Sequence, residues 1–302
     1  MTLREYASLI EDKLNEILPE AEKKTPETGE IPWLLQNAMR YSLMAGGKRL
    51  RPAMLLACAE MLGVSREEAM LPACALEMIH TYSLIHDDLP GMDNDTLRRG
   101  RPTNHVVFGE GQAILAGDGL LSLAMELMIQ NALAHPANGA GELQAMNEII
   151  CGAGVRGMVG GQCMDLYCER EQVMDEAMLS YIHMNKTARM LISPLRAAAA
   201  LAGCAADSAE RKALTAYGVN FGLLFQAVDD ILDVTGDEKT LGKSTGKDAA
   251  EGKLTYVTLY GLDGAREKAD ELAREAEKSL DLFGEKAAFF RALLESMKSR
   301  VS

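Results

Sequence analysis

Two clusters of aspartates stand far apart in the chain. The first contains Asp87, Asp88 and Asp93, and the second contains Asp229, Asp230 and Asp233. Neighbouring carboxylates repel one another unless a cation lies among them, and oxygen donors without a nearby set of His or Cys favour Mg²⁺ over zinc or copper. Mg²⁺ bound by a few carboxylates keeps its other positions for water and substrate phosphate. The clusters therefore predict an enzyme that binds a diphosphate from two sides through Mg²⁺.

The setting of the clusters supports this interpretation. Asp229 and Asp233 are four residues apart, so both lie on one helix face, where like charges are unfavourable. A solvated acidic helix end would explain one such cluster. It explains two less well, because each continues an apolar run of residues, 78–85 before the first cluster and 221–228 before the second.

Basic residues are concentrated near the first cluster. Arg98, Arg99 and Arg101 follow it, and the segment 46–52, GGKRLRP, precedes a helix that begins at Pro52. Arginine binds phosphate in a bidentate manner, and the N–H groups at a helix start add to an anion site. A solvated basic turn is the alternative interpretation of each segment.

Four further polar side chains are candidates. His80 lies two helical turns before the first aspartate, on a similar helix face, although a lone helical His more often has a structural role. Lys186 lies in an apolar helical stretch, where a lysine usually extends to solvent. Lys243 and Lys253 lie in a glycine-rich polar segment that is a candidate lid. The GKST sequence there is no nucleotide-binding loop, because the glycine spacing is wrong and no strand precedes it.

Helical periodicity dominates the chain, and no segment alternates as a strand does. The pattern predicts one all-α domain, 1–302, in which a helical bundle surrounds a central cavity and the two clusters face each other across its mouth. The expected helices are 3–18, 33–44, 52–62, 66–89, 112–133, 143–168, 176–201, 209–234, 256–262, 265–283 and 286–300.

The composition excludes some classes of function. The net charge of −13 over 302 residues argues against non-specific nucleic-acid binding, although a local basic cluster can still bind an anionic substrate. The six cysteines form no CxxC pair, which favours reduced thiols in the cytoplasm. We find no signal peptide and no apolar run that reaches the length of a membrane span. We expect a cytoplasmic protein without stable membrane insertion.

Several longer motifs resemble those of the trans-isoprenyl diphosphate synthases, and the likeness runs over nearly the whole chain. The motifs are GGKRLRP, EMIHTYSLIHDDLPGMDNDTLRRGRPTNH, NKTA, FGLLFQAVDDILDVTGD and LGKSTGKD followed by GKLTY, in the family's order. The four residues between Asp88 and Asp93 resemble the bacterial and plastid type. The resemblance implies an isoprenoid-synthase-like helical fold, a homodimer and three Mg²⁺ ions.

The resemblance also implies a reaction, the head-to-tail (1'-4) condensation of isopentenyl diphosphate with an allylic diphosphate such as dimethylallyl or geranyl diphosphate. Asp87 and Asp93, supported by Asp88, would bind two Mg²⁺ ions, and Asp229, assisted by Asp230 and Asp233, the third. Arg98, Lys186, Lys243 and Lys253 would bind the allylic diphosphate. Lys48, Arg51, His80 and Arg99 would hold isopentenyl diphosphate. Oxygens of Thr187 and Gln226 would face the allylic cation.

Product length depends in this family on the residue five positions before the first aspartate. Here that residue is Tyr82, followed by Ser83. A helix places Tyr82 about 7–8 Å deeper than Asp87, so a bulky ring there would stop the chain at fifteen carbons. Farnesyl diphosphate is the expected product. Thr96 departs from the family pattern, in which an acidic residue is common at this position, but Asp95 remains.

Three alternatives stay open. A geranylgeranyl diphosphate synthase would run the same chemistry for one more cycle. A class I terpene cyclase would share the helical architecture but needs no isopentenyl pocket, which the basic residues argue against. An inactive partner subunit would typically have lost an aspartate cluster, and this chain keeps both.

Overall fold

A computed structural model of the protein describes residues 1–236 and 253–300. Within these ranges the regular elements are helices, apart from one hairpin of two short antiparallel strands, β1 (Leu97–Arg98) and β2 (Arg101–Pro102). The predicted all-α class is confirmed.

The chain forms two compact units. Unit 1 comprises Met1–Leu56 and Arg66–Gly139, and unit 2 comprises Ala57–Ser65 and the described residues from Ala140 onward. The division falls within helix α3 (Leu50–Met61). The first aspartate cluster belongs to unit 1 and the second to unit 2.

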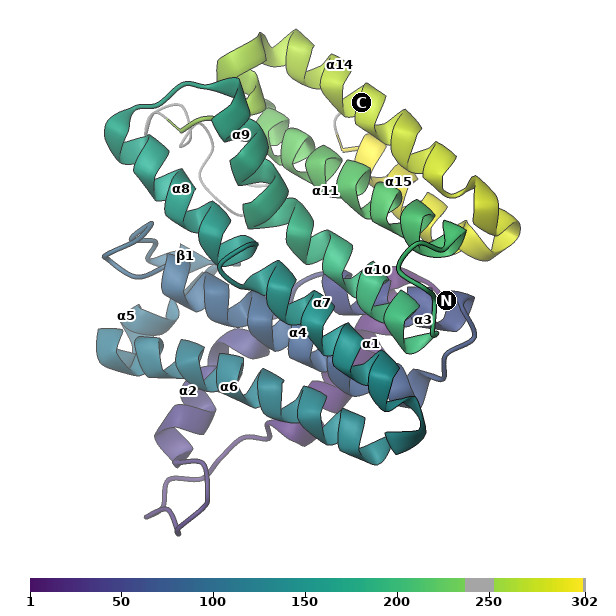
Figure 1. The fold of residues 1–302 in the computed structure, drawn as a ribbon. Helices are drawn as coiled ribbons and strands as arrows, with labels where there is room; N and C mark the ends of the chain where they lie inside the picture. The colour runs from purple at the N-terminus through teal and green to yellow at the C-terminus, as the bar shows by residue number, and fades with distance from the viewer. Residues whose placement is uncertain (237–252, 301–302) are drawn as a thin grey trace. The chain divides into compact units, whose positions relative to one another are not determined.

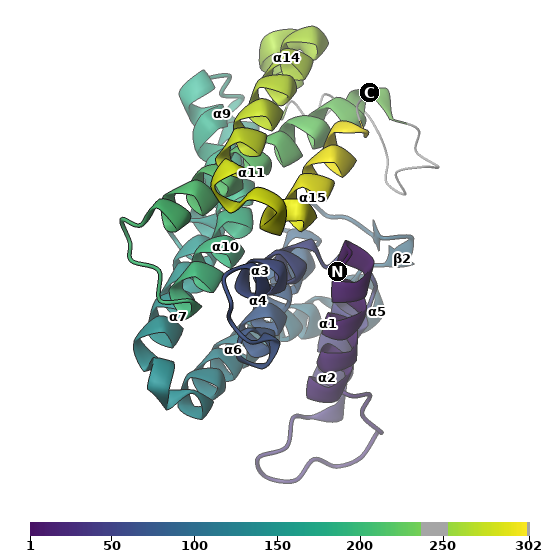
Figure 2. The ribbon, with the colours of Figure 1, turned by 90° about the vertical axis from the view of Figure 1, so that its right-hand side faces the viewer.

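Unit 1 is built around α4. Its other helices are α1 (Leu3–Ile17), α2 (Trp33–Leu43), α5 (Asn104–Phe108), α6 (Glu110–Ala134) and the 3-10 helix η1 (Pro136–Asn138). Figure 1 shows α4 (Arg66–Asp87) beside α6, and the turned view of Figure 2 shows α1 and α2 near it; α4 contacts all three helices. Because helices cover α4 on several sides, its apolar residues point in several directions.

Helix α6 differs from expectation. It is long and apolar enough to cross a membrane by length and composition, with a mean hydropathy of 1.4 over its most apolar window. The expectation that no apolar run reaches that length is therefore wrong. Core helices pass the same test, and α6 packs against α4, α2 and α5.

Unit 2 is built around α11 (Ala209–Thr235). Its other helices are α7 (Gly139–Ala153), α8 (Met158–Glu171), α9 (Glu176–Ile182), the π-helix η2 (His183–Ala188), α10 (Arg189–Leu201), α14 (Tyr256–Ser279), the 3-10 helix η3 (Asp281–Ala287) and α15 (Ala288–Lys298). Helix α11 lies beside α10 and α14 (Figure 1) and also contacts η2.

Two helices in unit 2 were predicted wrongly. The expected helix 176–201 is interrupted by η2, and the expected helix 143–168 is two helices, α7 and α8. The expected break between 256–262 and 265–283 corresponds to a kink in α14 at Gly261, where φ is 72° and the backbone is not helical. In each case a local irregularity of the backbone leaves the apolar periodicity almost unchanged.

Candidate active site

The first aspartate cluster lies at the carboxyl end of α4. This helix ends at Asp87, and the N–H of Asp93 donates to the carbonyl of Asp87 at 2.8 Å, which folds the third aspartate back toward the first. Asp87 and Asp93 are partly exposed, whereas Asp88 is only 3% exposed. The carboxyl end of a helix carries a partial negative charge. The partly exposed carboxylates of Asp87 and Asp93 at this end therefore favour binding of a cation.

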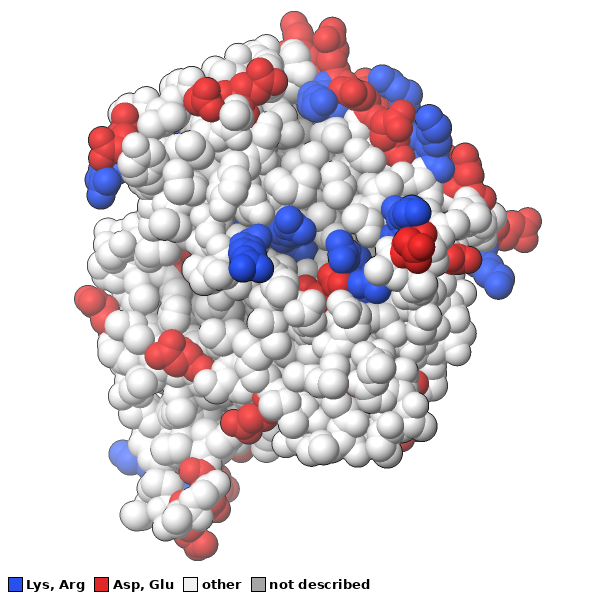
Figure 3. Space-filling view, viewed as in Figure 1, with Lys and Arg blue, Asp and Glu red and all other residues white. Residues whose placement is uncertain are grey.

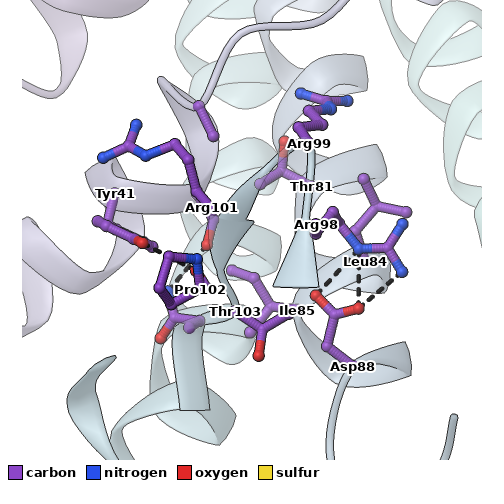
Figure 4. A pocket seen from close by; sticks show the side chains of 13 residues that line it. Tyr41, Thr81, Leu84, Ile85, Asp88, Arg98, Arg99, Arg101, Pro102 and Thr103 are labelled. Carbon is purple, nitrogen blue, oxygen red and sulfur yellow. Dashed lines mark hydrogen bonds and ion pairs between the residues drawn. The ribbon is translucent and has the colours of Figure 1, made fainter. Parts of the chain in front are cut away.

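Asp88 holds Arg98 of the hairpin. The Arg98 Nε donates to both Asp88 oxygens, at 2.8 and 3.0 Å, and its second terminal nitrogen lies 2.6 Å from Oδ1 (Figure 4). Burial raises the pKa of Asp88, and the hydrogen bonds from Arg98 act against that shift. Both oxygens of this carboxylate thus face a guanidinium, and the pair fixes the position of Arg98.

The hairpin that carries Arg98 and Arg99 is attached to α2. The Tyr41 hydroxyl donates to the carbonyl of Pro102 at 2.8 Å, and the Arg101 guanidinium lies over the Tyr41 ring at 4.7 Å (Figure 4). A cavity of about 30 Å³ lies among these residues and Asp88, enough for about one water molecule.

A cluster of two arginines and a histidine lies in the same unit. The Arg51 guanidinium is 3.4 Å from His80 Nε2, and the Arg99 guanidinium donates to the carbonyl of Gly46. Burial and the nearby guanidinium of Arg51 lower the pKa of His80 well below its ordinary value. Burial also lowers the pKa of Arg51 to about 10, so it remains protonated at neutral pH. Lys48 is exposed on the adjoining segment. The structure thus brings Arg51, His80 and Arg99 together.

A buried ion pair that the sequence did not indicate lies beneath this cluster. The Arg49 side chain is fully buried, donates to Glu77 at 2.8 Å and donates to the carbonyl of Leu43 at 2.7 Å. The backbone of Arg49 has a φ of 48°, in the left-handed region. The pair ties the basic segment between α2 and α3 to α4. A charged Glu77 inside an apolar helical run was the available signal.

The chain-length candidates lie on α4. Tyr82 is 8% exposed, and its ring meets the ring of His86 edge to face, with centroids 5.8 Å apart. Burial raises the pKa of Tyr82, and the charge of Asp87 acts in the same direction. The Ser83 hydroxyl donates to the carbonyl of His80 at 2.9 Å.

The second cluster lies at the carboxyl end of α11. Asp229 is partly exposed, whereas Asp230 and Asp233 are 2% and 4% exposed. Asp230 Oδ1 accepts from the Gln226 amide at 2.8 Å, and Oδ2 accepts from the backbone N–H of Tyr256 at 2.8 Å. As in the first cluster, the second aspartate of the pair is buried and bound by protein donors.

The π-helix η2 carries Lys186 and Thr187. It fits closely between α8 and α11 because glycines face it: a Cβ on Gly161 would overlap the backbone N of Lys186, and a Cβ on Gly222 would lie 2.6 Å from the Cβ of Ala188. Lys186 Nζ lies 2.5 Å from Asp165 of α8, a partner that the sequence did not indicate. The wide turn of a π-helix often marks a functional site.

A buried histidine was also missed. His183, at the start of η2, lies with Nε2 3.8 Å from Asp230 and its ring 4.7 Å from that of Tyr256. Burial lowers the pKa of His183 to about 3, so the ring is neutral.

The other two predicted lysines are Lys243 and Lys253. Lys243 lies outside the described residues, and Lys253 begins the last described segment, just before α14. In the part of the chain that the structure describes, no three His, Cys, Asp or Glu side chains are grouped so that they could hold a metal ion by themselves. Proteins usually bind Mg²⁺ through one or two carboxylates, with water and substrate phosphate as the other ligands.

The fold and these sites define a class: an all-α protein with a carboxylate cluster at the end of a buried helix in each unit and a cation cluster beside the first. Residues 32–289 match the polyprenyl synthetase family, and the chain belongs to that family. The resemblance drawn from the motifs is confirmed.

The chain is similar to several described proteins. Geranylgeranyl pyrophosphate synthase, chloroplastic, from Capsicum annuum is 47% identical over 258 residues, 85% of this chain and 69% of that protein. Among solved structures, an apo FPP/GFPP synthase from Zymomonas mobilis has a TM-score of 0.84 and 34% identity, and covers 97% of this chain and 96% of its own. The geranyltransferase from Helicobacter pylori, complexed with magnesium and isoprenyl diphosphate, has a TM-score of 0.80 and 32% identity, with coverages of 98% and 95%.

Proposed function

We propose that the protein is a Mg²⁺-dependent prenyltransferase that condenses isopentenyl diphosphate with dimethylallyl and geranyl diphosphates. The observation that carries the proposal is the cluster of Arg51, neutral His80 and Arg99 in the same unit as the first aspartate cluster. A terpene cyclase, which takes one allylic substrate, has no use for a second, basic anion site. The match to the polyprenyl synthetase family supports the same choice.

The carboxylates fit the expected metal. Asp87 and Asp93, with Asp88 behind them, would hold Mg²⁺ in unit 1, and Asp229, with Asp230 and Asp233 in support, would hold it in unit 2, with three ions expected from the family. When bound, Mg²⁺ acts as a Lewis acid that neutralises charge on the leaving diphosphate. The Helicobacter relative is complexed with magnesium, which supports this choice of ion.

The basic side chains would divide between the two substrates. Lys48, Arg51, His80 and Arg99 would bind isopentenyl diphosphate, with the neutral His80 donating one hydrogen bond. Arg98, Lys186, Lys243 and Lys253 would neutralise the allylic diphosphate as its C–O bond breaks. The isopentenyl double bond then attacks the allylic carbon, and a proton leaves to the released diphosphate. We propose that both units together form this single catalytic domain.

We propose farnesyl diphosphate as the main product. Tyr82 lies five residues before Asp87 on α4, about 7.5 Å deeper along the helix axis. Its ring is buried against His86, which supports a role as the floor beneath a growing chain. Geranylgeranyl diphosphate is the second candidate, favoured by the 47% identity to a geranylgeranyl pyrophosphate synthase.

One product assay tests these points. The purified protein is given isopentenyl diphosphate with dimethylallyl, geranyl or farnesyl diphosphate, with Mg²⁺ or with a chelator. We expect Mg²⁺-dependent C15 product from the first two starters and little from the third. Tyr82→Ala should lengthen the product to C20, and Tyr82→Phe, which keeps the ring, should not. Mainly C20 product from the unmodified protein would favour the second candidate, and activity in the chelator would contradict the proposed chemistry.

We further propose a homodimer formed through α6. Apolar side chains remain exposed along this helix, and the surface over α6 in Figure 3 carries few charged side chains; the exposed residues are Ile114, Leu115, Ile129 and Leu133. An exposed apolar patch of this kind marks an interaction surface. Leu115→Asp should produce monomers in light scattering, whereas Leu282→Asp on η3, at a similarly exposed position, should not.

A further inference from the structure

A chain of hydrogen bonds links the second aspartate cluster to the π-helix. The backbone N–H of Tyr256 donates to Asp230 Oδ2 at 2.8 Å, and Gln226 Nε2 donates to Asp230 Oδ1 at 2.8 Å. The Thr187 hydroxyl in turn donates to Gln226 Oε1 at 2.9 Å. The chain therefore connects the start of α14, the end of α11 and η2.

Chemistry fixes the direction of every bond in this chain. A backbone N–H can only donate, and an ionised carboxylate can only accept. Asp230 accepts from Tyr256, so the end of Gln226 that faces Asp230 must be its NH₂ group. The carbonyl of Gln226 then faces Thr187, and the Thr187 proton is committed to that carbonyl. What the Thr187 oxygen can still offer to a neighbouring group is a lone pair.

We propose that Asp230 is a positioning residue and not a ligand of Mg²⁺. Through Gln226 it fixes the hydroxyl of Thr187 so that a lone pair of the oxygen, and not the proton, faces the positive charge of the allylic carbon. The inference deepens the proposed function and rests on it. A hydroxyl that presented its proton to a developing cation would oppose ionisation, whereas a lone pair stabilises it. Asp230 prevents the unfavourable orientation through Gln226.

The burial of Asp230 separates it from its neighbour in the sequence. Asp230 is 2% exposed, and both of its oxygens receive protein donors, whereas Asp229 is partly exposed. A metal ion that keeps water and substrate phosphate among its ligands needs an accessible carboxylate. Asp229 meets that condition, and Asp230 does not.

Exchange of the carboxylate and amide groups between positions 230 and 226 provides a sharp test. In Asp230→Asn, the carbonyl of the introduced amide must face the Tyr256 N–H, so its NH₂ faces the NH₂ of Gln226. Gln226 must then flip, which presents an NH₂ to Thr187 and frees the Thr187 proton. In the double variant Asp230→Asn with Gln226→Glu, the new carboxylate accepts from the introduced amide and from Thr187. The double variant restores the original direction of the bond to Thr187 without restoring a carboxylate at position 230.

The readout is binding, so it does not depend on turnover. Isothermal titration measures the affinity for two probes. The cationic probe is an allylic ammonium compound, titrated in the presence of inorganic diphosphate and Mg²⁺. The probe without a charge on the allylic carbon is geranyl thiolodiphosphate, titrated in the presence of Mg²⁺. We expect Asp230→Asn to lower the affinity for the ammonium probe about tenfold or more, in line with loss of a hydrogen bond to a charged group. The affinity for the thiolodiphosphate should change less than about threefold. The double variant should recover most of the loss. In a Thr187→Val background, Asp230→Asn should no longer change the affinity for the ammonium probe.

Asp229→Asn serves as the metal-site comparison. It should raise the Mg²⁺ concentration needed to bind the thiolodiphosphate, and Asp230→Asn should not. If Asp230→Asn raises that concentration as much as Asp229→Asn does, and the double variant fails to recover ammonium binding, Asp230 is a metal ligand and the inference is overturned. Should Asp230→Asn unfold, the double variant alone decides, because it must bind both probes nearly as the unmodified protein does. Failure of the unmodified protein to bind the thiolodiphosphate with Mg²⁺ would instead contradict the proposed function.

Discussion

Replacement of Glu77 by Gln tests the buried support of the proposed isopentenyl pocket. The Arg49 and Glu77 side chains are 0% and 3% exposed, and the two charges meet at 2.8 Å. Gln has nearly the same shape and can still accept a hydrogen bond, so the change removes mainly the charge. Arg49 would then keep only the partly exposed carboxylate of Glu11, 3.3 Å from its Nε, and would lose its buried carboxylate. Loss of one partner from a buried pair costs about 3–5 kcal/mol, a large fraction of the roughly 5–15 kcal/mol that stabilises a typical protein.

Urea denaturation, followed by circular dichroism, measures this cost. The matched control is Glu16→Gln, because Lys13 and Glu16 also meet at 2.8 Å but their side chains are 38% and 66% exposed. An exposed pair contributes about 0–1 kcal/mol, so the control should shift the transition only slightly. The combined variant Arg49→Met with Glu77→Leu should be less destabilised than Glu77→Gln, because no buried charge is left alone.

The reasoning would be refuted if Glu77→Gln and Glu16→Gln lowered the free energy of unfolding equally. That result would mean that water reaches Arg49 and replaces the lost carboxylate. A change in the slope of the urea dependence would signal loss of two-state behaviour, and hydrogen exchange of the amides in α4 would then supply the comparison.

Two further predictions concern packing and pH. Gly222→Ala would place a Cβ 2.6 Å from that of Ala188 and should destabilise the protein by about 1–3 kcal/mol, whereas Gly139→Ala, where the added Cβ meets open space, should lower the thermal midpoint little. His80 stays neutral in the folded protein because its pKa is lowered, but in the unfolded chain it takes up a proton below about pH 6.5. The unfolded state thus binds more protons, so the free energy of unfolding should fall as pH drops below about 6.5, by up to about 1.4 kcal/mol per pH unit from this residue. His80→Gln should remove that part of the slope in denaturant titrations at pH 5 to 7, and an unchanged slope would contradict the assigned protonation state.

Much of the fold was predictable because apolar spacing directly reflects burial on a helix face. The limits of α11, expected at 209–234 and found at Ala209–Thr235, illustrate this. The π-helix η2 was not predictable, since one inserted residue barely disturbs an apolar pattern in a segment buried on several sides. The interruption of α14 was expected between residues 262 and 265, and the non-helical backbone lies close by at Gly261.

The candidate site was predictable in its residue types and less so in its contacts. Acidic and basic residues that are close in sequence, such as Asp88 and Arg98, could be grouped before the structure was known. Pairs such as Lys186 with Asp165, or Asp230 with the N–H of Tyr256, join different helices, and no local pattern encodes them. Arg49 lies in the basic segment 46–52 and is of a residue type that binds phosphate. Only its burial against Glu77 shows that it supports this segment instead.

The wide turn of η2 makes the directions of Lys186 and Thr187 depend on the number of residues in the turn. Removal of any one residue between His183 and Ala188 would allow an ordinary α-helix from α9 into α10, so that these two helices would keep nearly the same directions while the residues inside the turn would shift relative to them. Lys186 and Thr187 could then not both keep their present directions. Length variation at this point should therefore be far less tolerable than substitution, and a protein of this fold with a shorter turn here would have to bind its allylic substrate by other means.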